Sequence, residues 1–338
     1  MVKRIDKAWE REVEEIYSGY DIFHQAEGNE QLVYSGDEGD ASYRSDPLVE
    51  RIGGLLPLPE RGRLLDIGCG KGAFLGAWAR RRPGWTLEGH EVEADTRAVV
   101  EAIPGVARMH SGRLEAIEGE FDLVSMVHVL EHIANPIETL HQVRERVTDE
   151  GWLFVEVPHF VERAFDLLVA DHCSHLTPES LDRVVARAGF EAVSVSDSWN
   201  AKEVSGVFRP VPEGKPRTLE AGGFPDAFFS VARALAWLEG TLSLADRMRS
   251  RTSFGVFGTS IGATWLASSV ARPVDFFVDE DPNRQGRQHL GRPVLAPSEV
   301  REDSTVFMCL PHSQASHVSE RLTPPKNAWK PLLPPAPL

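Results

Sequence analysis

Residues 64–72 combine an apolar run, one acid and three closely spaced glycines, in the order Leu-Leu-Asp-Ile-Gly-Cys-Gly-Lys-Gly. Glycines at this spacing let the backbone turn tightly and approach a ligand without a Cβ in the way. Glu91 ends the next β-type run, where a carboxylate can accept both hydroxyls of a ribose. The pattern predicts a site for a nucleotide-type ligand at this glycine turn, with Glu91 beside it.

Alternating β-type and helical segments surround this turn and predict a parallel sheet with helices on both faces. A helix is expected to begin at Thr177-Pro178 and to end at Gly189, because Thr177 is an N-cap hydroxyl and Pro178 suits the first helical position. The expected strands are Arg63–Ile67, Trp85–Glu91, Phe121–Met126, Trp152–Val157, Phe190–Ser196 and Val204–Phe208, and the other helices lie near 72–82, 94–103 and 136–147.

A second α/β unit is predicted after a linker rich in proline, glycine and charge. It begins at 253–258 and returns at Val274–Val278 and Thr305–Leu310. The last 16 residues hold six prolines, so we expect a tail or surface strap without regular structure. The expected divisions are a cap at 1–50, a ligand-binding domain at 51–208, a linker and helix at 209–250, a Rossmann-like α/β domain at 251–322 and a tail at 323–338.

The bulk composition excludes several classes of protein. The net charge of −15 comes with scattered basic residues, which disfavours a nucleic-acid substrate and favours a small molecule. No apolar run is long enough to cross a membrane, and the N-terminus lacks the apolar core of a secretory signal. The three cysteines lie far apart without CxxC spacing, so we expect a reduced, cytoplasmic compartment. The oligomeric state stays open.

Two further motifs complete an ordered set. Phe121-Asp122-Leu123-Val124 leads into Val129-Leu130-Glu131-His132, and Gly151–Pro158 reads Gly-Trp-Leu-Phe-Val-Glu-Val-Pro. With the glycine turn and Glu91, this set resembles class I S-adenosylmethionine (SAM)-dependent methyltransferases over about residues 60–200. The resemblance implies a Rossmann-like seven-stranded α/β sheet and SAM as cofactor. It also implies that the glycine turn holds the methionine part of SAM through Asp66, Gly68 and Gly70, and that Glu91 holds the ribose. We further expect Cys69, Val92 and His128 to contact the cofactor.

The resemblance leaves some contacts to SAM open. Many members carry an acid after the third strand, but this chain reads His110-Ser111-Gly112-Arg113-Leu114 there, so we assign no adenine contact. The N-terminal cap is expected to add one or two contacts. Arg44 would pair with the SAM carboxylate, as arginine suits bidentate carboxylate binding. The other cap candidates are Tyr17, Tyr20, Gln31 and Tyr43.

The methyl acceptor should lie beyond the carboxyl ends of the fourth and fifth strands. His172 is our candidate for the base that takes the acceptor's proton, with Asp171 assisting and His132 as a further catalytic candidate. His132 could instead be a structural cap on its loop. We assign no metal site, although His172 and His175 have the H-x-x-H spacing that binds zinc together with a third group such as Asp171.

A closer resemblance concerns residues 171–181. The order Asp-His-x-x-His-Leu-Thr-Pro-Glu-Ser-Leu is similar to a segment of nucleotide-sugar C-methyltransferases whose histidine is implicated as a base. Gly255–Gly262 and Val278–Gly286 also resemble parts of that family's third domain. Two features depart from the family: its N-terminal cysteine zinc domain is absent, and His175 replaces an aromatic residue.

The second glycine turn, at 255–262, has two interpretations. Asp279 lies about where a ribose acid would lie, which would make the turn a dinucleotide site, but its spacing is G-x-x-G-x-x-x-G. A structural or substrate-contacting unit is the alternative.

We therefore expect a SAM-dependent methyltransferase that acts on a small polar metabolite, a sugar, nucleotide-sugar or natural-product intermediate. The alternatives are an O-methyltransferase for a phenolic or quinone-like molecule and a non-catalytic SAM-binding scaffold. The acceptor atom, whether carbon, oxygen or nitrogen, stays open.

Overall fold

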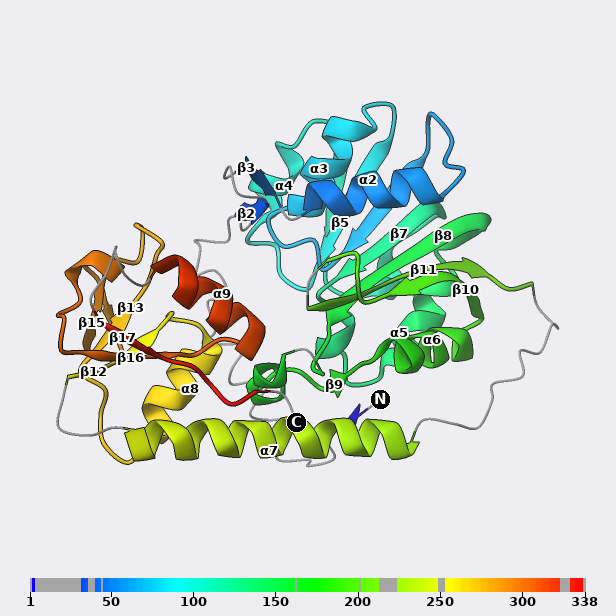
Figure 1. Cartoon of the computed structure of the whole chain (residues 1–338). Coiled ribbons are helices and arrows are strands. Elements are labelled where there is room, and N and C mark those ends of the chain that lie inside the picture. The colour runs from blue at the N-terminus through cyan, green and yellow to red at the C-terminus, as the bar shows by residue number, and fades with distance from the viewer. Residues whose placement is uncertain are drawn as a thin grey trace. The chain divides into compact units, whose positions relative to one another are not determined.

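The computed structural model describes residues 2–3, 32–35, 40–43, 45–161, 163–200, 202–212, 224–248, 253–322 and 329–336. The chain divides into two compact units (Figure 1). Unit 1 comprises Met1–His159 and Ala170–Phe224, and unit 2 comprises Phe160–Val169 and Pro225–Leu338. Within the described residues, no helix has both the length and the apolar character that a membrane crossing requires.

Unit 1 is built on a seven-stranded, mostly parallel sheet in the order β10-β11-β8-β7-β4-β5-β6. The two strands at the β10 end run antiparallel to their neighbours, and the other pairs are parallel. This confirms the expected α/β fold. The strands are β4 (Arg63–Ile67), β5 (Thr86–Glu91), β6 (Val106–Ser111), β7 (Phe121–Val127), β8 (Val147–Pro158), β10 (Phe190–Ser196) and β11 (Glu203–Pro210).

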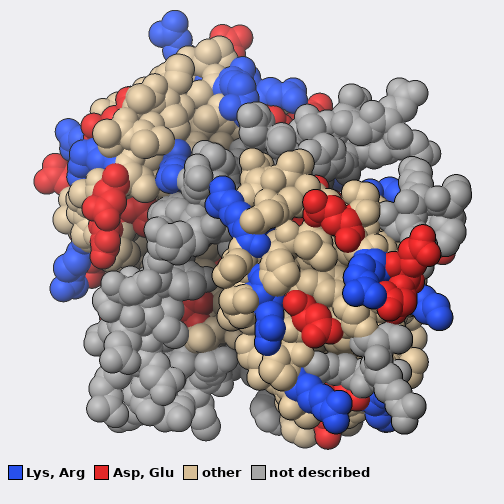
Figure 2. Space-filling view, turned by 90° about the vertical axis from the view of Figure 1, so that its left-hand side faces the viewer, with Lys and Arg blue, Asp and Glu red and all other residues tan. Residues whose placement is uncertain are grey.

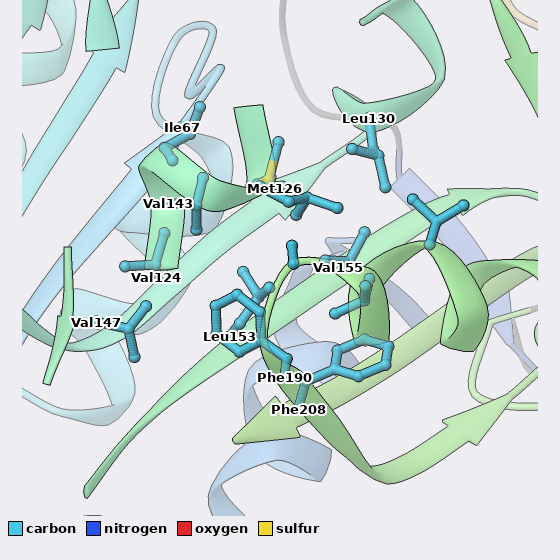
Figure 3. Close-up of a cluster of buried hydrophobic side chains, with 14 of the residues drawn as sticks. Ile67, Val124, Met126, Leu130, Val143, Val147, Leu153, Val155, Phe190 and Phe208 are labelled. Atoms are coloured by element: carbon cyan, nitrogen blue, oxygen red, sulfur yellow. The ribbon is translucent and has the colours of Figure 1, made fainter. Parts of the chain in front are cut away.

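Helices cover both faces of this sheet. Neighbouring strand residues point to opposite sides, so Leu65 joins the core beneath α5 and α6 whereas Leu64 joins the core beneath α2 and α3. Figure 3 shows the first of these two cores. The helices are α2 (Ser45–Leu55), α3 (Ala73–Arg81), α4 (Arg97–Glu101), α5 (Pro136–Arg144) and α6 (Pro178–Arg187).

Local signals set the start of α6 as predicted. The Thr177 hydroxyl accepts a hydrogen bond from the backbone N–H of Ser180 at 3.3 Å, and the Ser180 hydroxyl accepts one from the N–H of Thr177 at 2.8 Å. This reciprocal capping box satisfies two N–H groups that the helix cannot pair internally.

Three expectations about unit 1 need correction or fall outside the described residues. The polar segment Val106–Ser111 was not among the expected strands, but it forms the edge strand β6, of which only Met109 is buried. The expected cap at residues 1–50, in which we predicted no strand, contains an antiparallel pair, β2 (Leu32–Ser35) and β3 (Asp40–Tyr43), whose backbones hydrogen-bond to one another. The cap candidates Tyr17, Tyr20, Gln31 and Arg44 lie outside the described residues, as does the side chain of Tyr43.

Unit 2 holds a smaller sheet in the order β14-β15-β13-β12-β16-β17, parallel except for the β14–β15 pair. Its presence confirms the expected second, smaller α/β unit. Its strands are β12 (Phe254–Phe257), β13 (Phe276–Val278), β14 (Gln288–His289), β15 (Arg292–Leu295), β16 (Thr305–Met308) and β17 (Lys330–Leu332), and its helices are α7 (Phe224–Met248), α8 (Ile261–Ser269) and α9 (His312–Leu322).

Residues 160–169, which we expected within the first domain, belong to unit 2. They contain the 3₁₀ helix η4 (Ala164–Leu168). The Phe165 ring packs at 5.2 Å from Trp237 and at 6.1 Å from Trp265, between ring centroids. These aromatic contacts fix η4 to the core of unit 2.

The expectation that the C-terminal tail lacks regular structure was wrong. Lys330–Leu332 adds the parallel edge strand β17 beside β16. An edge strand tolerates Pro331, because a proline there need not donate a ladder hydrogen bond on its outer side. Trp329 anchors the strand, since it is almost fully buried and its indole N–H donates a 3.0 Å hydrogen bond to the carbonyl of Pro297.

Candidate active site

The glycine turn joins β4 to α3 and brings its backbone against β5. Gly68, Gly70 and Gly72 all have positive φ, at 67°, 55° and 81°. A Cβ on Gly68 would lie 2.3 Å from Cγ2 of Val129, so a side chain there would collide with the loop after β7. A Cβ on Gly70 would have nothing within 4 Å. The turn therefore packs tightly at Gly68 and leaves open space at Gly70, where a ligand can approach the backbone.

Glu91 reaches this turn from the end of β5. The Gly70 N–H donates a 2.6 Å hydrogen bond to Glu91 Oε1, and the Val92 N–H donates one of 3.3 Å to Glu91 Oε2. The Val92 side chain is exposed beside this carboxylate. Cys69, by contrast, is buried against β5, where a Cβ on Gly89 would lie 2.7 Å from its Sγ. The structure thus brings together Gly70, Glu91 and Val92, and leaves only the backbone of Cys69 to meet a ligand.

Asp66 lies beneath the turn in the interior of the sheet. Its carboxylate is buried and accepts a 2.7 Å hydrogen bond from the hydroxyl of Ser125 on β7. Burial raises the pKa of Asp66 to about 7, the charge of Glu91 adds to this rise, and the Ser125 hydrogen bond opposes it. From this position Asp66 can support the turn from inside the protein. Its direct contact with the cofactor stays a prediction.

His128 follows β7 with a φ of 56°, which is uncommon for a residue other than glycine. Its ring lies among three buried carboxylates. Nδ1 is 3.2 Å from Glu131 Oε1, and Nε2 is 3.6 Å from Glu156 Oε1 and 3.7 Å from Glu203 Oε2. The imidazole therefore links the ends of β7, β8 and β11, and its predicted contact with the cofactor stays a prediction.

Sequence reasoning missed Glu156 and Glu203 as members of this cluster. A signal existed for Glu156, because it is the one charged residue in the apolar run Trp152–Val157, and charged side chains are seldom fully buried without partners. Its Oε2 accepts a 2.8 Å hydrogen bond from the hydroxyl of Ser205 on β11. Glu203 had no comparable signal, because its partners come from other strands.

The three catalytic candidates meet beside this cluster. His132 ends the 3₁₀ helix η3 (Leu130–His132), and its Nδ1 lies 3.1 Å from Oδ2 of Asp171. The His172 ring meets the His132 ring edge-on, with 4.7 Å between centroids. We expected Asp171 to assist His172, but the ion pair that the structure shows for Asp171 is with His132.

Two hydrogen bonds hold these loops together. The Cys173 N–H donates to the Glu131 carbonyl at 2.7 Å, and the Cys173 thiol donates to the His132 carbonyl at 2.9 Å. His175 lies next to them in the short strand β9 (Ser174–His175), where it is buried and pairs in register with Val2 of β1 (Val2–Lys3). The segment after Asp171 is therefore fixed against η3 by backbone contacts.

The charges of His132 and Asp171 stabilise one another. Burial alone would lower the pKa of His132, but the Asp171 carboxylate 3.1 Å away and the charge of Glu131 outweigh it, so this pKa is raised. Burial would raise the pKa of Asp171, but His132 outweighs it, so that pKa is lowered. A carboxylate that orients an imidazole in this way is an arrangement suited to proton transfer.

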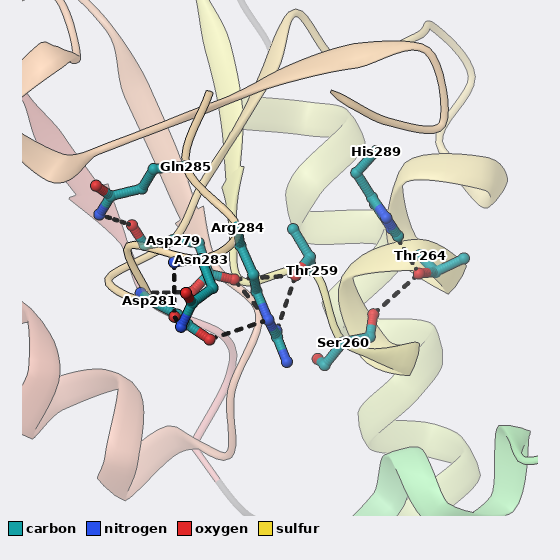
Figure 4. A network of polar contacts seen from close by, with 9 residues as sticks. All are labelled: Thr259, Ser260, Thr264, Asp279, Asp281, Asn283, Arg284, Gln285 and His289. Carbon is teal, nitrogen blue, oxygen red and sulfur yellow. Dashed lines mark hydrogen bonds and ion pairs between the residues drawn. The ribbon is translucent and has the colours of Figure 1, made fainter. Parts of the chain in front are cut away.

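The second glycine turn, in unit 2, carries its own polar network (Figure 4). Asp279 Oδ2 accepts a 2.9 Å hydrogen bond from the Thr259 hydroxyl, and Oδ1 accepts one of 3.0 Å from the Asp281 N–H. Arg284 donates to the Thr259 oxygen at 2.9 Å and lies 3.4 Å from Asp279 Oδ2. Both oxygens of Asp279 thus have partners within the chain, which favours the structural interpretation of this turn.

Comparison with known proteins agrees with this geometry. The sequence model of the family described as "Methyltransferase domain" matches residues 38–195. These residues form a class I SAM-dependent methyltransferase domain. SAM is accordingly the cofactor of this domain.

Two curated relatives carry the name ubiquinone biosynthesis O-methyltransferase. The protein from Paracidovorax citrulli is 30% identical over 128 residues, which cover 35% of this chain and 52% of that protein. The protein from Cereibacter sphaeroides is 28% identical over 184 residues, which cover 44% of this chain and 71% of that protein. The chain thus spans about half the length of the Paracidovorax relative.

Solved structures of methyltransferases are similar to this chain as well. A TehB-like SAM-dependent methyltransferase from Corynebacterium glutamicum is 16% identical, with a TM-score of 0.39, and the match covers 59% of this chain and 98% of that one. A methyltransferase of calicheamicin biosynthesis in its SAH-bound form is 20% identical, with a TM-score of 0.43, and the match covers 58% and 60% of the two chains.

The glycine turn of the methyltransferase domain fits SAM. The open space at Gly70 admits a ligand against the backbone, and the Glu91 carboxylate beside it can accept the two ribose hydroxyls. The exposed Val92 offers an apolar surface next to that carboxylate. The residues present therefore suit a nucleoside with a ribose and a planar base.

Proposed function

We propose that this chain transfers a methyl group from SAM to a hydroxyl oxygen of a small phenolic or quinone-like molecule. The observation that carries the proposal is the Asp171–His132 pair, 3.1 Å apart, with the His172 ring edge-on beside it. The loop that carries His132 begins at Val129, whose side chain fills the space beside Gly68. The proton-accepting group thus follows directly on the loop that packs against the cofactor turn.

In this proposal the cofactor turn binds and orients the methyl donor. Gly70 and Val92 line it, Glu91 accepts from the ribose, and Asp66 supports the turn from beneath. When bound, SAM supplies a methyl group on a positively charged sulfur. An oxygen nucleophile would attack the methyl carbon in line with the carbon–sulfur bond, and S-adenosylhomocysteine would leave.

The acceptor side of the site removes a proton. His132 takes the hydroxyl proton, Asp171 holds the imidazole in one orientation, and the His172 ring lies edge-on beside it. The raised pKa of His132 makes its neutral form a stronger proton acceptor than an exposed histidine. An ionised oxygen is the better nucleophile for methyl transfer.

The name that the relatives share supports an oxygen acceptor. The scattered charge of the protein supports a small molecule over a nucleic acid, and basic and acidic side chains are interspersed on the face shown in Figure 2. We place the reaction in the cytoplasm, where the buried thiols of Cys69, Cys173 and Cys309 would stay reduced.

A second candidate acceptor is a sugar or nucleotide-sugar. Two parts of the chain support it, the segment Asp171–Leu181 and the second α/β unit. Both resemble parts of nucleotide-sugar C-methyltransferases. In that case the acceptor is an acidic carbon, and the same histidine pair removes its proton.

The test is a methyl-transfer assay with radiolabelled SAM against two panels, one of polyhydroxylated aromatic compounds and one of nucleotide-sugars. We expect label in an aromatic ether and a fall in turnover of about 10²-fold or more in His132→Ala, with SAM affinity by calorimetry nearly unchanged. SAM binding without label transfer to either panel would support a non-catalytic scaffold and overturn the proposal.

A further inference from the structure

Three side chains of types that bind metal ions lie close together where η3 meets β9. Glu131, His132 and His172 each offer one ligand atom, and these atoms all lie within 4.8 Å of one another. All three residues belong to unit 1. Ligand atoms about 2 Å from a common ion lie roughly 3–4 Å apart, so small side-chain rotations would bring this set to an ion.

The orientation of His132 suits a ligand. Its Nδ1 faces Asp171 at 3.1 Å, so its Nε2 is the nitrogen directed towards Glu131, 4.0 Å from Oε1. A histidine that binds a metal through one nitrogen usually donates its other N–H to a carboxylate, which fixes the ring and raises its basicity. Asp171 provides that carboxylate.

The buried carboxylate of Glu131 also points to a bound ion. Its side chain is only 2% exposed, and Oε1 lies 3.2 Å from His128 Nδ1. The other oxygen, Oε2, is buried and has no hydrogen-bond partner in the part of the chain that the structure describes. A buried carboxylate oxygen without a partner is costly, so such an atom calls for a ligand or an ion.

The backbone holds the donor set in place before any ion arrives. The two hydrogen bonds from Cys173 to the carbonyls of Glu131 and His132 join the loop of His172 to the loop of the other two ligands. Ligands that come from fixed loops lose little freedom on binding, which favours affinity.

We propose that Glu131, His132 and His172 bind one divalent transition-metal ion, with Asp171 orienting His132. Two imidazoles and one carboxylate suit Zn²⁺, Fe²⁺ or Mn²⁺ better than Mg²⁺, which requires mostly oxygen ligands. Three protein ligands leave coordination positions for an acceptor oxygen. The consequence for the acceptor rests on the proposed function: the bound ion, rather than a free His132, would then lower the pKa of the acceptor hydroxyl.

Calorimetry on the full chain, stripped with EDTA and then dialysed, tests the site without SAM or acceptor. We expect Zn²⁺ and Mn²⁺ to titrate to one ion per chain and Mg²⁺ to bind far more weakly. Glu131→Gln and His172→Asn should each weaken binding by at least tenfold. The matched controls Glu138→Gln and His141→Asn change exposed residues of α5 in the same unit and should bind as the parent protein does.

Asp171→Asn keeps all three ligands and provides a second test if a ligand variant does not fold. We expect it to weaken Zn²⁺ binding by about 10–100-fold. Co²⁺ in place of Zn²⁺ should give visible absorption bands that disappear in His172→Asn. The proposal is overturned if no saturable binding reaches one equivalent, or if the ligand variants, shown to be folded by circular dichroism, bind Zn²⁺ as tightly as the controls.

The metal site and the proposed function fail separately. Tight ion binding without methyl transfer to either acceptor panel keeps the metal site and removes the proposed function. Methyl transfer to the aromatic panel, together with no saturable binding of Zn²⁺ or Mn²⁺ in the calorimetry, keeps the proposed function and removes the metal site.

Discussion

The imidazole of His132 and the carboxylate of Asp171 lie 3.1 Å apart although they come from separate loops, one after β7 and one after η4. This pair sets the pH behaviour expected of the site. The pKa of His132 is raised by the pair, and that of Asp171 is lowered.

The pair predicts a stability that depends on pH in two directions. A histidine with a raised folded pKa contributes stability that is complete below its unfolded pKa and is lost as the pH rises through its folded pKa. An aspartate with a lowered folded pKa contributes stability above its unfolded pKa and loses it as the pH falls through its folded pKa. The advantage of the parent over Asp171→Asn should therefore be largest between the ordinary pKa values of the two groups, 3.8 and 6.5, and decline on both sides in urea unfolding. A constant difference from about pH 2 to about pH 9 would contradict an ionised pair.

Gly70→Ala should weaken SAM binding by at least tenfold, because an alanine Cβ would fill the open space beside the turn. Gly291→Ala is a matched control, since Gly291 in unit 2 also has a positive φ, 71° against 55°, and open space around it. Both variants should lose about 1–2 kcal/mol of stability from the left-handed backbone. Calorimetry with SAM separates them, and an equal loss of SAM affinity in both would remove Gly70 from the cofactor site.

Glu91→Gln should weaken SAM binding by about tenfold or more, which corresponds to roughly 1.4 kcal/mol. The amide can still accept from the Gly70 N–H, but it loses the charge and one of the two acceptors for a ribose. Glu93→Gln, an exposed change two positions away, is the control and should bind SAM as the parent does.

Asp66 predicts a loss of stability as the pH rises from about 4 to about 7. Its pKa is raised by burial from 3.8 to about 7, so the folded protein holds a proton that the unfolded chain has released. The free energy of unfolding should fall by up to about 1.4 kcal/mol per pH unit over this range because of Asp66. Asp66→Asn removes the titration, so urea unfolding of this variant should show a flatter pH profile. The same slope in both proteins would place the proton elsewhere.

Trp329→Ala should destabilise unit 2 by about 3–5 kcal/mol, because the indole is almost fully buried and its N–H is bonded to Pro297. Phe229→Ala, at an exposed position of α7, should change stability by less than about 0.5 kcal/mol. Urea unfolding followed by circular dichroism checks both. A small effect of Trp329→Ala would mean that β17 adds little to the sheet.

Much of the fold followed from local patterns in the sequence. The bounds of β4 and the start of α6 match the expected residues, because an apolar run and a capping box are local signals. The polar edge strand β6 and the short strand β17 gave no such signal, since hydrogen bonds to a neighbouring strand create them. The glycine turn and the place of Glu91 at the end of the next strand followed from the sequence, whereas the hydrogen bond between Gly70 and Glu91 appeared only in the structure.

The acceptor side was less predictable. His132, Asp171 and His172 were expected as candidates, but the partner of Asp171 depends on how two separate loops pack. Glu156 and Glu203 join His128 only because β8 and β11 are neighbours in the sheet. Contacts of this kind are decided by tertiary structure, and a single sequence does not display them.

Because η4 belongs to unit 2 but lies between two segments of unit 1, recombination between related genes can separate parts of unit 2. The chain changes unit after His159, after Val169 and after Phe224, so neither unit is one continuous stretch of sequence. A single crossover between two related genes near residue 224 would join the η4 of one parent to the C-terminal unit of the other. Phe165 and its partners Trp237 and Trp265 would then come from different parents, so we expect such chimaeras to fold only where these three aromatic residues are compatible.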